Sequence, residues 1–400
     1  MTRTAVLAYS GGLDTSCAIG WLLEDYGFDR VIAVLVDVGQ ELDMHGSIVR
    51  GEAAGADVVV LDRVEAYANE QVARALKANA LYEGRYPLVS ALSRPVIAEA
   101  VASLAEEIGA EAAVHGCTGK GNDQLRFELA FKATYPGVTV IAPLRDRVWT
   151  RDEELVYAAD RGIPVAQKPA SPYSVDENLL GRSIEAGMLE DPWVAPPEDA
   201  FALTQDPAGA PAPAELVIGF EHGLPTTLGG GELPLHELVR SLNALAGSYG
   251  VGRIDMVENR AVGIKSRELY EAPAALVLID AHRALEDLVL TKAELRAKRW
   301  VEEQWTELVY AGGWFSPLRS ALDAFVDATQ QPVTGEVRVQ LRPGAAVVTG
   351  RRSEHGLYAE SLASYATGET FPHEAAEGFL RIVTLEAELA AARAKGRVHA

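Results

Sequence analysis

A short glycine- and hydroxyl-rich segment between a predicted strand and a predicted helix constrains the fold most. Residues 8–16 read Ala-Tyr-Ser-Gly-Gly-Leu-Asp-Thr-Ser, after the apolar run 4–8 and before a helical repeat of apolar side chains over 19–26. Adjacent glycines let a ligand approach the main chain closely, and the first amides of a helix attract anions. The segment therefore predicts a strand, loop and helix that bind phosphate, although Gly-Gly alone is equally typical of an ordinary turn.

The spacing of this loop excludes a Walker phosphate loop, which needs Gly-x4-Gly-Lys-Ser/Thr. The nearest approach to that pattern, Gly116 to Lys120, is followed by Gly121 and Asn122 and does not complete it. The stretch 8–16 resembles instead the pyrophosphate-binding loop of the N-type ATP pyrophosphatases. That resemblance implies an enzyme that adenylylates a substrate and releases pyrophosphate, but the loop by itself identifies the superfamily and not the reaction.

Composition limits the class of protein further. The 400 residues provide for two or three domains, and 48% apolar and 23% charged residues are ordinary for a soluble globular protein. We expect no membrane span, because no run of about 18 apolar residues occurs. The two cysteines, Cys17 and Cys117, argue against a secreted disulfide scaffold and favour a cytoplasmic protein. A net charge of −21 without a basic run disfavours tRNA or DNA as a partner.

Strand and helix patterns alternate through the first 166 residues. Repeated βα units with continuously apolar strands predict a parallel sheet covered by helices on both faces, which is an α/β fold. Thr150 and Glu153 have the spacing of a capping box, and Pro95 is expected to start a helix. The predicted strands after the first are 31–36, 58–61, 112–115 and 138–142, and the predicted helices are 46–55, 63–80, 94–108 and the one that Gly162 closes.

Ligands of such sheets bind beyond the carboxyl ends of the strands, where three polar loops should gather. These loops begin at Ser10, Asp37 and Gly116. Val36, at the end of its strand, either lines an adenine pocket with its backbone or packs in the core.

The third loop, His115 to Phe127, concentrates polar groups of different chemistry. Three glycines, a Thr, a Lys, an Asn, an Asp and an Arg lie within it, which favours a binding loop over a solvated turn. Asn122 or Asp123 is placed to cap the helix that follows. Arg94, before Pro95, is expected in extended backbone, either as a carboxylate ligand or as half of a structural salt bridge.

The composition changes after Gln167, and we expect a second, α+β domain there. A polar segment with prolines extends from Lys168 to Leu179, and residues 190–214 carry six prolines and predict an irregular connection. A final helix over 373–395 has an apolar face that packs either on its own subunit or on a neighbouring one. The predicted strands are 216–220, 336–341 and 346–349, the predicted helices 234–249, 273–290 and 292–311, and the predicted domains 1–166, 167–370 and 371–400.

Several further stretches resemble the argininosuccinate synthase family. Thr118 to Asp123 (Thr-Gly-Lys-Gly-Asn-Asp) and Val257 to Arg260 (Val-Glu-Asn-Arg) are far more specific than the phosphate loop. The resemblance implies an adenine nucleotide alpha hydrolase-like parallel-sheet domain, a synthetase and multimerisation domain, and a C-terminal oligomerisation helix, in a homotetramer. The matching stretches are 8–16, 82–87, 93–95, 115–127, 174–179, 183–187, 252–260, 265–267 and 270–273.

The resemblance also implies a two-step ligase reaction in arginine biosynthesis. The ureido oxygen of citrulline attacks the α-phosphorus of ATP to give citrullyl-AMP and pyrophosphate, and the amine of aspartate then displaces AMP to give argininosuccinate. Mg²⁺ is expected with the ATP. By similarity, ATP is contacted by Ala8, Tyr9, Ser10, Gly11, Gly12, Leu13, Asp14, Thr15, Ser16, Val36 and Gly116, aspartate by Thr118, Asn122 and Asp123, and citrulline by Tyr86, Asn122, Arg126, Ser174, Ser183, Glu258 and Tyr270.

Structural roles remain open for several of these residues. Some relatives carry a serine that helps to hold citrulline where this chain has Ala91, so that contact is absent unless Ser90 or Ser93 supplies it. The eight histidines are scattered and indicate no catalytic base, nucleophile pair or metal site. The structural alternatives are an ion pair between Arg126 and Glu258, helix caps at Ser174 and Ser183, and core rings at Tyr86 and Tyr270.

Two other functions fit part of the sequence. An enzyme that adenylylates and thiolates tRNA would use reactive thiols, and Cys17 and Cys117 lie near the predicted loops, although buried structural cysteine is commoner. A nucleotide sensor would bind ATP without turnover. Such a sensor would not need the polar residues at 174, 183, 258 and 270, outside the nucleotide domain.

Overall fold

The computed structural model describes residues 2–41, 43–147, 149–165, 172–365 and 370–396. The chain forms two compact units, residues 1–355 and residues 356–400. The domain boundary predicted at 166/167 and the first part of the predicted connecting segment, Lys168 to Ser171, lie outside the described residues. Across the described ranges, no helix is long and apolar enough to cross a membrane.

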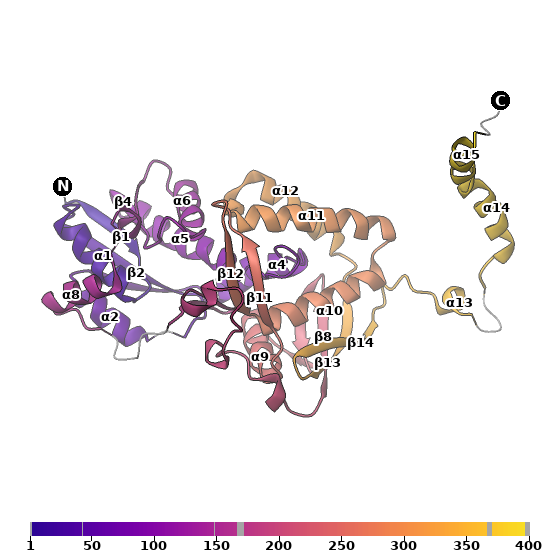
Figure 1. The fold of residues 1–400 in the computed structure, drawn as a ribbon, viewed down its shortest axis with the longest axis horizontal. Coiled ribbons are helices and arrows are strands. Elements are labelled where there is room, and N and C mark those ends of the chain that lie inside the picture. Colours follow the sequence, from indigo (N-terminus) through magenta and orange to yellow (C-terminus); the bar gives the residue numbers. More distant parts are fainter. Residues whose placement is uncertain (1, 42, 148, 166–171, 366–369, 397–400) are drawn as a thin grey trace. The chain divides into compact units, whose positions relative to one another are not determined.

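A parallel sheet forms the core of the first half, which confirms the predicted α/β fold class. Its strand order is β3-β2-β1-β4-β5, and every pairing is parallel. Val6 belongs to one buried cluster, while Ala5 and Leu7 belong to another, because helices cover both faces of the sheet (Figure 1). The strands are β1 (Thr4–Ala8), β2 (Arg30–Asp37), β3 (Asp57–Asp62), β4 (Ala112–Val114) and β5 (Thr139–Ile141).

The strand order changes direction between β1 and β4. Strands β2 and β3 follow β1 on one side, whereas β4 and β5 lie on the other. Such a switch point opens a crevice beyond the carboxyl ends of the strands, where ligands of open α/β sheets bind. The loops that begin at Tyr9 and His115 both leave the sheet at this switch point.

The helices of this half follow the predicted segments with local differences. The capping box of Thr150 and Glu153 is confirmed. The helix predicted over 63–80 is divided by a π-helical turn, Ala68–Val72, and ends at Lys77. The helices are α1 (Leu13–Glu24), α2 (Met44–Ala53), α3 (Val64–Tyr67), α4 (Ala73–Lys77), α5 (Val89–Glu107), α6 (Asp123–Thr134), α7 (Pro143–Asp146) and α8 (Arg151–Asp160).

The prediction that Pro95 starts a helix is wrong. Helix α5 begins at Val89, so Pro95 lies inside it and Arg94 is helical rather than extended. An interior proline costs about 3 kcal/mol, since it cannot donate to the carbonyl four residues earlier, here that of Ala91. Ala91 and Leu92 are fully buried, and packing of this first turn against the core offsets that cost.

The second half contains more strands than the sequence indicated. The polar stretches 174–185 and 253–271 form an antiparallel sheet in the order β11-β12-β7-β6, and a second antiparallel sheet has the order β10-β9-β8-β13-β14. Ser174 and Ser183 lie in strands, so the alternative that they cap helices is wrong. The strands are β6 (Ser174–Asn178), β7 (Gly181–Glu185), β8 (Ala214–Glu221), β9 (Leu224–Leu228), β10 (Gly231–Glu232), β11 (Arg253–Asn259), β12 (Lys265–Glu271), β13 (Gly335–Arg342) and β14 (Ala345–Arg352), and the helices α9 (Leu235–Gly247), α10 (Pro273–Val289), α11 (Lys292–Tyr310) and α12 (Pro317–Thr329).

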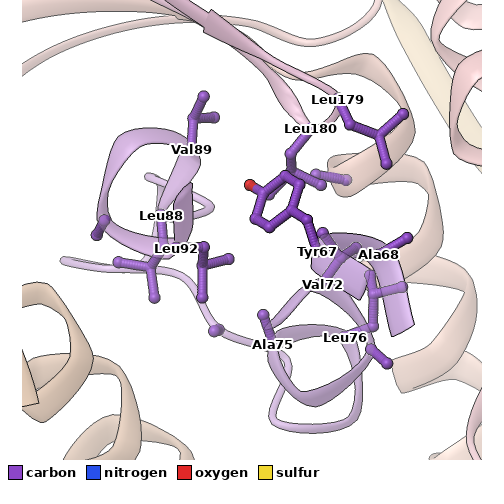
Figure 2. Close-up of a cluster of buried hydrophobic side chains, with 14 of the residues drawn as sticks. Tyr67, Ala68, Val72, Ala75, Leu76, Leu88, Val89, Leu92, Leu179 and Leu180 are labelled. Carbon is purple, nitrogen blue, oxygen red and sulfur yellow. The ribbon is translucent and has the colours of Figure 1, made fainter. Parts of the chain in front are cut away.

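One buried cluster joins the two halves of the first unit. Tyr67 and Leu76 from α3 and α4 meet Leu88 beside α5 and the pair Leu179 and Leu180, which connects β6 to β7 (Figure 2). All of these side chains are at most 3% exposed. The Tyr67 hydroxyl also donates to Asn178 Oδ1 at 3.2 Å. The first and second halves therefore share a hydrophobic core.

The C-terminal unit contains α13 (Glu360–Ala363), α14 (His373–Val383) and α15 (Leu385–Ala394). The single helix predicted over 373–395 is divided at Thr384, whose hydroxyl donates to the Leu380 carbonyl at 2.9 Å. A hydroxyl that bonds back to the preceding turn bends a helix. The predicted apolar face exists, and its side chains are exposed in this single chain; they include Phe379, Ile382, Val383, Leu385 and Leu389.

A buried ionic network supports the second half near α10 and α11. The Lys298 ammonium, on a side chain 1% exposed, contacts Glu286 Oε1 at 2.9 Å and also pairs with Glu302. It donates to the Lys77 carbonyl at 2.7 Å as well. Asn79 Nδ2 donates to both carboxylates at 2.7 Å. The network therefore holds the segment after α4 against α10 and α11.

Replacement of Lys298 by methionine should destabilise the protein strongly. The variant Lys298→Met leaves the buried Glu286 and the half-buried Glu302 without their cation, which costs about 3–5 kcal/mol in the free energy of unfolding. Lys292→Met, on the exposed start of the same helix, should change it by less than about 0.5 kcal/mol. Urea denaturation of both variants measures the difference, and equal stabilities would contradict the role of the network.

Candidate functional site

The loop after β1 has the geometry of an anion site. Gly12 occupies the N-cap of α1 in extended backbone, and no side chain caps the helix there. The amides of the first turn are therefore available to a ligand. Two hydroxyls stand beside them, with Ser10 Oγ and Thr15 Oγ1 3.1 Å apart. Ser16 Oγ donates to the Gly12 carbonyl at 2.7 Å and shapes the turn.

Helix α2 fixes the outer side of this loop. Gly11 has φ +78°, and a Cβ there would lie 2.2 Å from Ser47 Oγ. Arg50 Nε donates to the Gly11 carbonyl at 2.8 Å. The Tyr9 hydroxyl bonds Ser16 Oγ and the Ser47 carbonyl, both at 3.0 Å. The backbone is thus held in one conformation before a ligand arrives.

The loop after β4 lies against the first loop. A Cβ on Gly116 would lie 2.7 Å from Thr15 Cγ2, so the two loops touch. Val36 is 3% exposed, and its carbonyl accepts a hydrogen bond from Gln40 Nε2 at 2.9 Å. These contacts fit a Val36 side chain that packs in the core. The role of the Val36 backbone in lining an adenine pocket stays a prediction.

The start of α6 carries a paired carboxylate. Arg94 Nε donates to Asp123 Oδ2 at 2.6 Å and Arg126 Nη1 to Asp123 Oδ1 at 2.8 Å. Arg94 also pairs with Asp176 at 2.5 Å. Burial alone would raise the pKa of Asp123, but the two guanidinium groups hold it below its ordinary value. Arg94 therefore forms the structural salt bridge, one of its two predicted roles.

Asn122 occupies the N-cap of α6 without capping it by its side chain. Its Nδ2 donates to the Tyr310 hydroxyl at 2.8 Å, and its Oδ1 accepts from the Ala261 amide at 2.9 Å. Glu258, 3% exposed, accepts hydrogen bonds from Tyr270 at 2.6 Å and Tyr310 at 2.7 Å. The predicted cap is thus a cross-link between α6, the β11–β12 turn and the end of α11.

Aromatic rings pack around the polar cluster that Asn122, Glu258 and Tyr310 form. Tyr86 stacks on Tyr270 with centroids 4.0 Å apart, and Tyr82 stacks on Tyr310 at 3.5 Å. Burial, with Tyr86 and Glu258 close by, raises the pKa of Tyr270 above its ordinary value, so the phenol stays protonated and donates. The alternative that Tyr86 and Tyr270 are core rings is confirmed, because both belong to the buried hydrophobic cluster. Both rings also border the polar cluster.

The other predicted citrulline residues lie on the adjoining sheet. Ser183 on β7 is opposite Tyr270 on β12, whereas Ser174 is exposed on β6. Ser90 Oγ lies 2.7 Å from Ser183 Oγ. A hydroxyl therefore stands next to Ala91 in sequence and beside Ser183 in space, and its use as a citrulline contact remains a prediction.

Arg126 and Glu258 do not pair with each other among the contacts of the described residues. Arg126 bonds Asp123 and the Tyr310 carbonyl, while Glu258 bonds the two tyrosines. The predicted alternative of an ion pair between them is wrong. Thr118 is exposed on the loop that leads to Asn122.

Sequence reasoning missed Tyr310 and Asp176. Tyr310 ends a long amphipathic helix, where an aromatic residue normally indicates core packing. Its contacts come from α6 and β11, more than 50 residues away in sequence. No local signal could therefore have found Tyr310. Asp176 lies in a strand that was not predicted, although the stretch 174–179 that contains it is one of those that resemble the family.

The comparisons with known proteins cover nearly the whole chain. Residues 4–164 match the model of the "Arginosuccinate synthase N-terminal HUP domain", and residues 173–390 match that of the "Arginosuccinate synthase C-terminal domain". The chain belongs to the argininosuccinate synthase family. Argininosuccinate synthases of Bacillus thuringiensis (strain Al Hakam), Bacillus cereus (strain 03BB102) and Bacillus anthracis are each 52% identical to it over 387 residues, 96% of both chains. This membership makes the chain a ligase with argininosuccinate synthase activity.

The cysteines do not have the character that sulfur transfer needs. Cys17 is fully buried, and its thiol donates to the Glu154 carbonyl at 3.7 Å. Burial and nearby carboxylates raise its pKa to about 12. Burial likewise raises the pKa of Cys117 well above its ordinary value. Because the thiolate is the reactive form, both thiols are poor nucleophiles, which disfavours tRNA thiolation.

Glu154 on α8 lies next to the phosphate loop. It is 5% exposed, and burial together with the charge and hydrogen bond of Asp14 raises its pKa to about 7. Arg151 contacts Asp14 at 3.2 Å and opposes this shift. Glu154 therefore keeps its proton below about pH 7.

The stability of the protein should fall as the pH rises from about 4.5 to about 7 because of Glu154. In that range the unfolded chain has released the proton and the folded chain has not. Glu154→Gln removes this dependence and stabilises the protein most at pH 8, whereas Asp152→Asn, an exposed change on the same helix, does not. Denaturant midpoints at pH 5, 6, 7 and 8 provide the measurement, and parallel profiles for all three proteins would contradict a raised pKa of Glu154.

Gly11→Ala should impair ATP binding by more than its loss of stability explains. The added methyl must displace Ser47 and with it the phosphate loop, which lowers kcat/KM for ATP by about tenfold or more. Gly137 has φ +89° and open space around a Cβ. Gly137→Ala therefore pays only the backbone penalty of about 1–2 kcal/mol and keeps the wild-type KM for ATP. Equal ATP kinetics in the two variants would argue against the phosphate site.

Proposed function

We propose that the chain joins citrulline to aspartate at the crevice between β1 and β4, with citrullyl-AMP as intermediate and AMP and pyrophosphate as products. The observation that carries the proposal is the single loop from Gly116 to Asp123. One end touches the phosphate loop at Thr15, and the other end enters the polar cluster of Tyr310 and Glu258. An activated phosphate and an amino-acid substrate can therefore meet along this loop.

We assign the first step to the phosphate loop and the polar cluster bordered by Tyr86 and Tyr270. The ureido oxygen of citrulline forms a bond to the α-phosphorus while the bond to pyrophosphate breaks. Loop amides and hydroxyls stabilise the leaving pyrophosphate. A urea oxygen is a weak nucleophile, so holding it in line supplies much of the rate. The proposed ATP contacts are Ala8, Tyr9, Ser10, Gly11, Gly12, Leu13, Asp14, Thr15, Ser16, Val36 and Gly116, and the proposed citrulline contacts are Tyr86, Asn122, Arg126, Ser174, Ser183, Glu258 and Tyr270.

The second step is assigned to Thr118, Asn122 and Asp123, which would hold aspartate. Each Asp123 oxygen accepts one bond from an arginine, and each keeps a lone pair for an ammonium group. Once the amine loses a proton, it attacks the activated carbon of citrullyl-AMP. The carbon–oxygen bond to AMP then breaks, and AMP leaves.

The remaining proposals concern cofactor and assembly. Among the described residues no group of three His, Cys, Asp or Glu side chains is placed to hold a metal ion, so Mg²⁺ would be coordinated mainly by ATP phosphates and water. The exposed apolar face of α14 and α15 supports a homotetramer in which residues 371–400 pack on another copy. We further propose a cytoplasmic protein, no nucleic-acid partner, and domains 1–166 and 167–370.

Pyrophosphate release should require citrulline. Purified protein with ATP and citrulline should release pyrophosphate and accumulate the adenylate, because the first step needs no aspartate. Asp123→Asn should retain this partial reaction. Argininosuccinate formation should fall about tenfold or more, because the variant loses a charge-assisted contact to the aspartate amine. A pulse-chase of the adenylate separates the two steps.

Release of pyrophosphate without citrulline would contradict the proposed reaction, and absence of turnover with all three substrates would favour a nucleotide sensor. Equal loss of both steps in Asp123→Asn would contradict only the assignment of Asp123. Glu128→Gln on the same helix, which lies outside the proposed substrate contacts, is the matched control for a change of charge.

A further inference from the structure

The direction of the hydrogen bonds around Asn122 is fixed by a backbone amide. The Ala261 N–H can only donate, so the Asn122 atom 2.9 Å from it is the carbonyl oxygen. Asn122 Nδ2 must then face the Tyr310 hydroxyl, 2.8 Å away. Since this nitrogen can only donate, the Tyr310 oxygen accepts.

The single proton of Tyr310 must therefore go to another acceptor. Glu258 Oε1 lies at 2.7 Å and the Asn259 carbonyl at 3.2 Å. A carboxylate at the shorter distance is the stronger acceptor. Hydrogen bonds thus run in one direction, from Ala261 through Asn122 and Tyr310 to Glu258.

This chain of hydrogen bonds determines which atoms of Asn122 and Glu258 stay available to substrates. Asn122 keeps one N–H and one lone pair. Glu258 Oε2 accepts from Tyr270, so the carboxylate keeps acceptor sites on both oxygens and presents no donor. Without the Tyr310 hydroxyl, the Asn122 amide and the Glu258 carboxylate would each lose a partner in a buried setting.

The main chain of Tyr310 fixes a third group. Its carbonyl accepts from Arg126 Nε at 3.1 Å and from Nη2 at 2.9 Å, which directs Nη1 to Asp123. The Tyr310 ring is held independently by its stack on Tyr82. A change to phenylalanine keeps the ring and the carbonyl and removes only the hydroxyl.

We propose that Tyr310 is a positioning residue for both amino-acid substrates. Its hydroxyl orients the Asn122 amide and the Glu258 carboxylate so that the amide offers a donor and the carboxylate offers acceptors. The inference rests on the proposed assignment of Asn122 and Glu258 to the substrates. Tyr310 itself acts through these two residues and not on the reacting atoms.

Tyr310→Phe should raise the KM for citrulline and for aspartate about tenfold each, because a charge-assisted hydrogen bond is lost. The KM for ATP should change less than about twofold. The matched control is Tyr82→Phe. It removes the hydroxyl from the other ring of the same stack, which donates to the Asn259 carbonyl at 2.7 Å and leaves Asn122 and Glu258 unchanged. All three KM values should stay within about twofold of wild type in this control.

A second variant tests the direction of this chain of hydrogen bonds without changing Tyr310. Ala261 is the second residue of the turn that Gly263 N closes on the Arg260 carbonyl at 2.9 Å, a position that proline favours. Ala261→Pro keeps the turn and removes the N–H that orients Asn122. It should raise the same two KM values, so the proposal stays testable even where Tyr310→Phe folds poorly.

A double-mutant cycle separates positioning from general structural support. In an Asn122→Ala background, Tyr310→Phe should add no further increase in the KM for aspartate, because the two residues act in one chain. Additive effects, an equal rise in the KM for ATP, or Tyr310→Phe kinetics equal to those of Tyr82→Phe would each overturn the proposal. If wild-type protein lacks citrulline-dependent pyrophosphate release, the proposed function fails instead. If wild type shows that release and Asn122→Ala raises both KM values while Tyr310→Phe does not, only the role of Tyr310 fails.

Discussion

The loop between β4 and α6 is constrained at both ends, and the placement of the polar cluster around Asn122 relative to the loop after β1 depends on this. At one end Gly116 lies so close to Thr15 that a side chain at position 116 would crowd it. At the other end Asn122 is bonded to Ala261 and Tyr310. An in-line attack requires the two sites to keep a fixed separation to within a fraction of an ångström. The contacts at the two ends of the loop restrict that separation before substrates bind.

Buried and half-buried charges in this region are paired with one another. Asp123 lies between two arginines, and Arg260 lies between Glu185 and Glu268. Burial and the neighbouring Glu185 raise the pKa of Glu268 to about 8 despite the arginine. Such groups have little freedom to reorient, so the field that they create is organised before the reaction. The net charge of −21 describes the chain as a whole and does not describe this cluster, in which cations and anions alternate.

The sequence predicted the parallel sheet because its strands are continuously apolar and its loops carry glycine. It failed at β6, β7, β11 and β12, where stretches such as Ser-Val-Asp-Glu-Asn pair mainly through the backbone and show little hydrophobic alternation. The prediction at Pro95 was wrong because the preference of proline for the first turn of a helix was outweighed by the burial of Ala91 and Leu92. Motif resemblance named Asn122, Asp123, Arg126 and Glu258, whereas Tyr310 depends on contacts between distant segments that no local pattern encodes.

The shared core of Tyr67, Leu88, Leu179 and Leu180 has a consequence for protein engineering. Leu179 N also donates to the Val38 carbonyl at 2.9 Å, just beyond β2, so a segment of the second half completes the strand-end region of the first. The first half is therefore not a transplantable module. Cutting the gene between the halves would expose apolar surface on both fragments, and grafting the first half onto another synthetase would require a matching pair of leucines from the new partner.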